Sequence, residues 1–235
     1  MNEFFSGVIA FLAYLVPLAA LMLASRVLIK IPDELFRKIL HFILLGAYVP
    51  FLFGFTVWWH CVAFIVGLAA LLFPLLYFMA KIPGFSKFVN ERNNGEFTSS
   101  MLLALGVMAG SISIGWGLMG DRYIVLAGVY AWGVGDAFAA LIGKRFGRHK
   151  ITWRFVDNKK SVEGTLAMVI TSAIAVFTVL LLRGGISVGL AAVIAVVAAS
   201  ASALAELCTK NGLDTVTCPL VSMLIILPMI SLLGG

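Results

Sequence analysis

One acidic residue inside an apolar stretch is the part of this sequence most suited to chemistry. Asp136 lies about 10 Å, by the rise of an α-helix, from the end of its apolar run at Gly143. A charged side chain inside a membrane span costs at least ~2.5 kcal/mol and by default indicates a functional site. The alternative is a carboxylate that pairs with a basic residue of a neighbouring helix. Gly133 and Gly135 beside it would let another backbone, or a phosphate, approach closely.

Two basic segments follow Asp136 along the chain. The first is the glycine-flanked turn 143–148, and the second is the run 158–165, in which Lys159 and Lys160 directly precede a predicted helix. Helix N-termini attract phosphate through free N–H groups and the macrodipole, and lysines add charge. The pattern therefore favours phosphate binding. Two alternatives are that the bases contact acidic lipid head groups and that Ser161 is simply the N-cap of the helix.

Further charged residues lie at the ends of other apolar runs, in three groups: Arg37 to His41, Arg92 with Glu96, and Glu206 with Asp214. Each could be an interfacial charge that reaches water. However, all but two of the 11 acidic residues fall at the same ends of the runs as the basic ones. Acids contribute little to orientation in a membrane. A site for divalent cations and a polyanionic substrate would explain this bias.

Eight apolar runs must position these residues: 4–25, 42–59, 61–80, 97–120, 123–143, 164–182, 184–205 and 215–235. The chain is 62% hydrophobic and 12% charged, with a mean hydropathy of +1.07. These values exclude a soluble globular enzyme, a disordered tail and a secreted disulfide scaffold. Runs this long without period-2 alternation also exclude a lipid-facing barrel. We predict an all-α integral membrane protein, a polytopic bundle of about eight transmembrane helices in one catalytic domain, residues 1–235. The cluster 58–60 suits a turn at the interface.

The basic residues predict the orientation of these spans. Of the 17 Lys and Arg, all but Arg122 and Arg183 fall in four alternate connections: 26–38, 81–96, 144–163 and 206–214. By the positive-inside rule, these connections are cytoplasmic and both termini lie on the non-cytoplasmic side. Membrane orientation thus explains the net charge of +6 without a nucleic-acid partner.

Taken in order, these segments resemble the family of CTP-dependent polyprenol, dolichol and phytol kinases. The resemblance rests on the following positions: Glu34 to His41, Arg92 to Glu96, Gly135 and Asp136 with Ala139 and Gly143, Lys159 to Thr165, and Glu206 with Asp214 and Pro219. Thr215 stands where the family often has asparagine. Phosphatidate cytidylyltransferases share the Gly-Asp and Lys-Lys-x-x-Glu-Gly portions, but their C-terminal signature of Lys-Asp, His-Gly-Gly and Asp-Arg is absent here.

The resemblance implies transfer of the γ-phosphoryl group of CTP, with Mg²⁺, to the hydroxyl of a membrane isoprenoid alcohol or diacylglycerol at the cytoplasmic interface. It implies catalytic roles for Asp136, Glu163, Glu206 and Asp214, and metal binding by Asp136, Glu163 and Asp214. The nucleotide-binding residues that it implies are Arg37, Lys38, His41, Arg92, Glu96, Gly135, Gly143, Lys144, Lys159, Lys160, Ser161, Gly164 and Thr165. Two alternatives stay open, a cytidylyltransferase-like enzyme and a membrane transporter. A transporter predicts charges spread through the membrane depth, often in repeated halves.

Overall fold

The fold is all-helical throughout the part of the chain that the structure describes. A computed structural model describes residues 3–29, 32–82, 84–85, 95–152, 156, 160–209 and 213–233. Within these ranges there is no strand, only an isolated antiparallel bridge between Lys150 and Ser161. Eight described helical segments are long and apolar enough to cross a membrane. The predicted fold class and number of spans are therefore confirmed.

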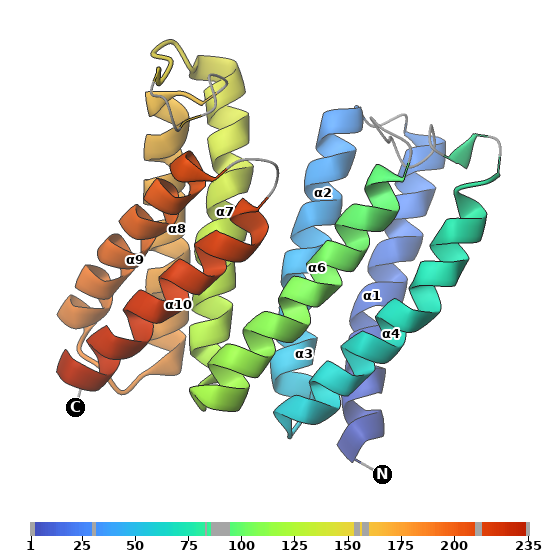
Figure 1. The fold of residues 1–235 in the computed structure, drawn as a ribbon, viewed down its shortest axis with the longest axis horizontal. Helices are drawn as coiled ribbons and strands as arrows, with labels where there is room; N and C mark the ends of the chain where they lie inside the picture. Colours follow the sequence, from blue (N-terminus) through green and yellow to red (C-terminus); the bar gives the residue numbers. More distant parts are fainter. Residues whose placement is uncertain are drawn as a thin grey trace. The chain divides into compact units, whose positions relative to one another are not determined.

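The chain forms two compact units, Met1–Ser113 and Ile114–Gly235. The first contains α1 (Glu3–Leu28), α2 (Asp33–Gly46), α3 (Tyr48–Gly54), α4 (Trp58–Met79) and α6 (Glu96–Ile112) (Figure 1). A π-helix, η1 (Ser113–Leu118), begins at the boundary. The second unit continues with α7 (Arg122–Phe146), α8 (Val162–Arg183), α9 (Val188–Cys208) and α10 (Asp214–Leu233).

The second span begins earlier and is less regular than predicted. Its helix starts at Asp33, before the predicted apolar run, and the basic cluster near Arg37, which we expected to open this span, lies within α2. The helix is interrupted at Ala47 and resumes as α3. Pro50 explains the interruption, because it has no N–H to donate to the carbonyl of Gly46 and its ring crowds that carbonyl.

The turn between the second and third spans also differs from the prediction. We expected residues 58–60 to form it, but they are the first residues of α4. The turn consists of residues 55–57, and the hydroxyl of Thr56 donates to the carboxylate of Glu3 at 2.8 Å. Within this turn, Phe55 is buried against Gly7, where an added Cβ would lie 2.5 Å from the ring. Aromatic packing, rather than an interfacial tryptophan turn, therefore closes this end of the first unit.

Small residues bring α7 and α8 unusually close together in the second unit. A Cβ added at Gly135 would lie 2.2 Å from Oγ of Ser172, and one at Gly164 would lie 2.9 Å from the carbonyl oxygen of Ala139. The hydroxyl of Ser172 donates to the carbonyl of Ala131 across the contact. Membrane helices commonly pack through such small residues, since little else drives their association in lipid. This contact determines which face of α7 packs against α8. It therefore also sets the position of Asp136 relative to the start of α8.

The two basic residues outside the four basic connections both have partners within the second unit. Nε of Arg183 lies 2.6 Å from a carboxylate oxygen of Asp121, which also caps α7 by accepting from N–H of Tyr123 at 2.8 Å. The guanidinium of Arg122 lies 4.1 Å from the ring centre of Trp116. These contacts stabilise the end of the unit where α7 begins and α8 ends.

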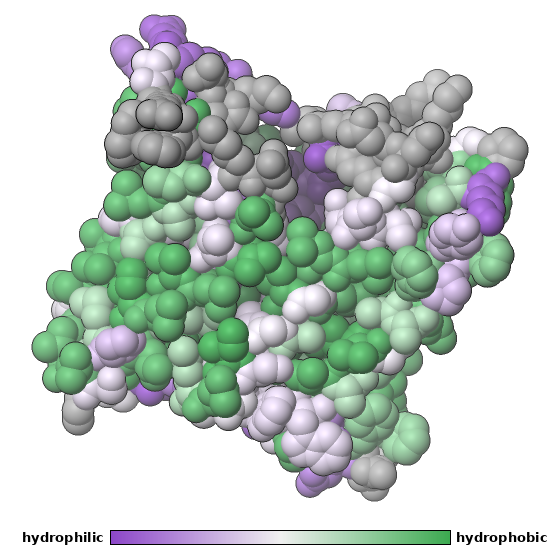
Figure 2. Space-filling model, in the orientation of Figure 1, coloured by the Kyte–Doolittle hydropathy of each residue, from purple (hydrophilic) through white to green (hydrophobic). Residues whose placement is uncertain are grey.

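The opposite end of the second unit is its most polar visible part. In Figure 2, apolar residues cover the middle of its helices, whereas hydrophilic residues gather where α7 leads into the segment before α8. This distribution fits a bundle that spans a bilayer and exposes one end to water.

Candidate functional site

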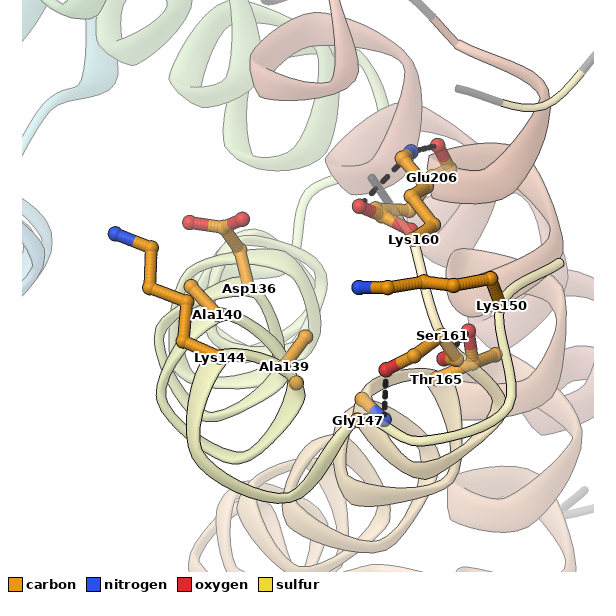
Figure 3. Close-up of a pocket in the computed structure, with 12 residues that line it drawn as sticks. Asp136, Ala139, Ala140, Lys144, Gly147, Lys150, Lys160, Ser161, Thr165 and Glu206 are labelled. Carbon is orange, nitrogen blue, oxygen red and sulfur yellow. Dashed lines mark hydrogen bonds and ion pairs between the residues drawn. The ribbon is translucent and has the colours of Figure 1, made fainter. Parts of the chain in front are cut away.

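A pocket of about 660 Å³ opens at this polar end, a volume typical of sites for small molecules and cofactors. Its lining comes from the second half of α7, the segment before α8, the first turn of α8 and the end of α9 (Figure 3). The lining residues are Asp136, Ala139, Ala140, Gly143, Lys144, Gly147, Lys150, Lys160, Ser161, Gly164, Thr165 and Glu206.

The pocket combines three lysines with two carboxylates. Asp136 is half-buried on α7, and Lys144 is exposed two turns further along the same face. Lys150 extends into the pocket from the segment that follows α7 (Figure 3). Lys160 and Glu206 lie at the start of α8 and the end of α9. Ammonium groups suit phosphate oxygens, and carboxylates suit a hard divalent cation, so the arrangement fits a polyanion bound together with Mg²⁺.

Lys160 and Glu206 form an ion pair. Nζ of Lys160 lies 2.9 Å from Oε1 of Glu206, and their side chains are only 20% and 13% exposed. The same ammonium group donates to the backbone carbonyl of Glu206, in the last turn of α9. A cation at a helix C-terminus satisfies carbonyls that have no partner within the helix. Lys160, which we predicted to bind phosphate, therefore also holds the end of α9 against the start of α8.

We expect Lys160→Met to lower the melting temperature of the detergent-purified protein. The substitution leaves the carboxylate of Glu206 mostly buried without its cation, and a hydrogen bond to a charged group contributes about 1.5–3 kcal/mol. Adding Glu206→Gln should recover part of the loss, because no charge then remains stranded. Thermal unfolding of the two variants measures this. An unchanged melting temperature in Lys160→Met would contradict the stabilising role.

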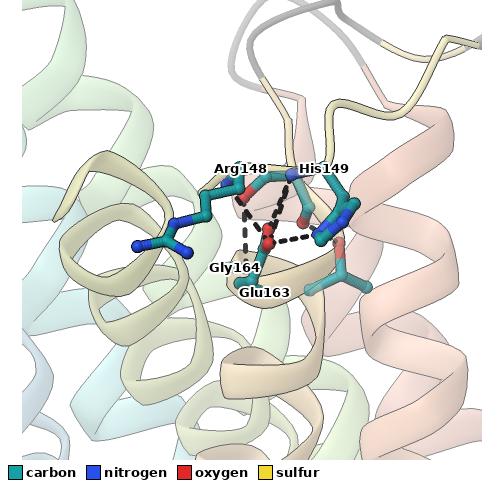
Figure 4. Close-up of polar contacts among 6 residues, drawn as sticks. Arg148, His149, Glu163 and Gly164 are labelled. Atoms are coloured by element: carbon teal, nitrogen blue, oxygen red, sulfur yellow. Dashed lines mark hydrogen bonds and ion pairs between the residues drawn. The ribbon is translucent and has the colours of Figure 1, made fainter. Parts of the chain in front are cut away.

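Glu163 does not line the pocket. Its Oε1 accepts hydrogen bonds at 3.2 Å from the backbone N–H of both Arg148 and His149, and lies 2.7 Å from Nδ1 of His149 (Figure 4). The carboxylate thus turns toward the segment that follows α7. Glu163 was predicted to be catalytic and to bind metal. In the structure, its contacts instead hold the backbone of the segment that follows α7.

Asp214 also lies outside the pocket lining. It is in the first turn of α10 and accepts a hydrogen bond from Nε1 of Trp132 on α7 at 3.2 Å. Asp136 and Glu206, by contrast, line the same pocket. Nevertheless, no three or more described Asp, Glu, His or Cys residues are arranged to hold a metal by themselves. A magnesium ion at this pocket would need further oxygen ligands, such as those of a bound phosphate.

The serine and glycines of the predicted nucleotide site shape the pocket wall. Ser161 is the N-cap of α8, and its hydroxyl accepts from N–H of Gly164 at 3.2 Å, as the N-cap alternative predicted. Gly143 and Thr165 also line the pocket. Gly135 does not: it is buried against α8. We expected either another backbone or a phosphate to approach Gly135 closely. The structure shows the close approach of another helix, α8.

The other predicted nucleotide-binding residues are not among the described residues that line the pocket. Arg37, Lys38 and His41 are on α2, in the first unit, and Glu96 begins α6 there, although its side chain is not among those described. Two more, Arg92 and Lys159, lie outside the described residues. The described residues that line the pocket all belong to the second unit.

Four of the lining residues were not among the predicted site residues: Ala139, Ala140, Gly147 and Lys150. Lys150 counted only as one of the orienting charges, and its bridge to Ser161 is what brings it to the pocket. A Cβ added at Gly147 would lie 2.2 Å from the carbonyl oxygen of Gly143 and 2.6 Å from Oγ of Ser161. A glycine is required here because the chain passes close to the end of α7 and to Ser161. No local sequence pattern predicts this close contact.

Membrane-length helices with a pocket of lysines and carboxylates at one polar end define a multi-pass membrane protein whose pocket suits a charged ligand. Comparison with known proteins then specifies its family. The chain is 32% identical over 216 residues to a phytol kinase from Synechocystis sp., covering 88% of this chain and 86% of that relative. It therefore belongs to the polyprenol and phytol kinase family, a class of lipid-alcohol kinases. No family model matches the chain, and no solved structure matches it.

Proposed function

We propose that this protein transfers the γ-phosphoryl group of CTP to the hydroxyl of a membrane isoprenoid alcohol of the phytol, dolichol or polyprenol type, or of diacylglycerol. The bond between the γ-phosphorus and its bridging oxygen breaks, a bond to the alcohol oxygen forms, and CDP and the hydroxyl proton leave. The observation that carries the proposal is the pocket at the polar end of α7, where three lysines meet two carboxylates. The phytol kinase relative supports the lipid-alcohol acceptor.

The lining residues divide between phosphate and metal. Lys144 and Lys150 face the pocket from two segments and would neutralise the phosphates of the donor. Asp136 and Glu206 line the same pocket and would hold Mg²⁺, which supplies charge neutralisation on the transferred group. Because Lys160 already pairs with Glu206, phosphate and carboxylate compete for its ammonium group. Donor binding would then draw Lys160 toward phosphate and leave Glu206 available to the metal.

Labelled CTP tests the reaction in membranes that contain the protein. The proposal expects γ-phosphate label, and no cytidine label, in the extracted lipid when phytol, dolichol, a polyprenol or diacylglycerol is supplied. Cytidine label in the lipid would instead indicate a cytidylyltransferase-like reaction. Neither label in lipid, with uptake of a solute into sealed vesicles, would indicate a transporter. ATP in parallel reactions tests the choice of nucleotide.

We further propose that the chain acts as one catalytic domain, with its pocket facing the cytoplasm and both termini on the opposite side. Thiol labelling tests this orientation. Cys208 is exposed and is replaced by serine, whereas the other native thiols, those of Cys61 and Cys218, are buried. Leu118 and Arg145 are both exposed and lie near the two ends of the second unit. A membrane-impermeant thiol reagent should label Leu118→Cys in intact cells, and Arg145→Cys only after the membranes are opened. The reverse pattern would contradict the orientation.

A further inference from the structure

We propose that Glu163 is a positioning residue, which holds residues 148–150 against the start of α8 so that Lys150 faces the donor phosphates. This role rests on the proposed function, because it assigns a phosphate contact to Lys150. It replaces the metal-binding role that the sequence suggested for Glu163.

The contacts of Glu163 all lead to one short segment. Its carboxylate accepts from the backbone N–H of Arg148 at 3.2 Å and of His149 at 3.2 and 3.4 Å, and lies 2.7 Å from Nδ1 of the His149 ring. Two consecutive amides and an imidazole thus converge on one carboxylate (Figure 4). The side chain of Glu163 is 26% exposed and that of His149 is 78% exposed, so the imidazole contact is open to water.

Backbone pairing extends this attachment to Lys150. N–H of Val162 donates to the carbonyl of His149 at 3.0 Å, and N–H of Ile151 donates to the carbonyl of Lys160 at 3.1 Å. Lys150 lies between these two hydrogen bonds, opposite Ser161. The segment is therefore pinned on both sides of Lys150, by Glu163 on one side and by the backbone of Lys160 on the other.

The position of Glu163 suits this task better than metal binding. It is the second residue of α8, after the N-cap Ser161, where a carboxylate is favoured by the helix dipole. From there it reaches the amides of a segment that has no helix or strand of its own to satisfy them. If the segment were not attached, Lys150 would lose conformational freedom when it binds phosphate. Attachment of the segment before binding lowers this entropic cost.

Hydrogen–deuterium exchange of the detergent-purified protein tests the attachment without reference to activity. In Glu163→Ala, the amides of Arg148 and His149 lose their acceptor, and we expect their exchange to become about tenfold faster or more. Glu163→Gln retains one carbonyl acceptor and should give a smaller increase. Asp121→Ala, which removes a carboxylate at the other end of α7, is the matched control and should leave this peptide unchanged. Unchanged exchange in both Glu163 variants would overturn the proposal.

Donor kinetics test the connection to Lys150. Glu163→Ala should raise the apparent KM for CTP about tenfold with kcat within about threefold, because it misplaces a binding group and leaves the reacting centre intact. Lys150→Ala should do the same, and the double variant should be no worse than Lys150→Ala alone. The magnesium requirement should stay unchanged in Glu163→Gln. A higher magnesium requirement, or additive effects in the double variant, would overturn the positioning role.

The two readouts distinguish this proposal from the proposed function. If the wild-type protein transfers no phosphoryl group from CTP to any lipid alcohol, the proposed function fails, and the exchange measurement still decides whether Glu163 holds the segment. If the wild-type protein is active and the Glu163 variants match it in both exchange and KM, only the positioning role fails.

Discussion

Asp136→Asn is expected to abolish phosphoryl transfer, by at least about a thousandfold, in a protein that still folds. The side chain lies within a membrane-length helix and lines the pocket, and asparagine occupies the same volume without the charge. If Asp136 holds Mg²⁺ against the donor phosphates, losing that contact should cost several kcal/mol of transition-state stabilisation. Each 1.36 kcal/mol corresponds to a tenfold change in rate.

The matched control is Asp121→Asn, the same substitution in the N-cap of the same helix. It weakens the ion pair with Arg183 and should lower the melting temperature, while turnover per folded molecule stays near that of the wild type. Melting temperature and transfer from labelled CTP are measured for both variants in detergent. If Asp136 is instead a structural interhelical charge, Asp136→Asn will show low abundance with near-normal activity per surviving molecule. That result, or normal turnover in a stable variant, would reject the metal-binding role.

Gly135→Val is expected to prevent α7 and α8 from packing, and so to cause a large loss of folded protein. An added Cβ would already lie 2.2 Å from Oγ of Ser172 and 2.8 Å from Cγ of Met168. Ser172 is fully buried and donates to the carbonyl of Ala131, so it has little room to move away. Overpacking in a tight core commonly costs about 1–3 kcal/mol, and the γ-carbons of valine add to the clash.

A control and a rescue make this prediction specific. Gly189→Val places the same side chain on α9, where an added Cβ has no atom within 4 Å, and should leave the melting temperature within a few degrees of wild type. Combining the milder Gly135→Ala with Ser172→Gly removes the nearest clashing atom and should restore much of the folded protein. If the restored protein is also active, Gly135 serves packing alone. If it folds but no longer binds CTP, the predicted nucleotide contact of Gly135 stands.

The distribution of spans could be predicted because hydropathy and length are local properties. A run of about 20 apolar residues has to form a helix in a bilayer wherever it lies, since every backbone polar group must find a partner within the segment. Each predicted run accordingly overlaps a membrane-length helix of the structure. The largest difference lies in the second span, whose helix begins at Asp33 and is interrupted at Ala47, just before Pro50.

Part of the candidate site was also predictable from local sequence. Asp136 is conspicuous because a carboxylate within an apolar run is costly, and Ser161 is a favoured N-cap residue directly before an apolar run. Both side chains line the pocket. Their identification needed no information about which helices are neighbours.

The remaining assignments depended on the tertiary structure. The pairing of Lys160 with Glu206 joins residues 46 positions apart and follows from the packing of α8 against α9. Lys150 reaches the pocket only because its segment folds back along Lys160 and Ser161, and the same fold turns Glu163 away from the pocket. Sequence alone determined that these charged residues lie at a helix end, because local hydropathy decides where a span stops. Which of them face one another was decided by helix rotation and by the path of a short connecting segment, since both result from contacts between residues far apart in the chain.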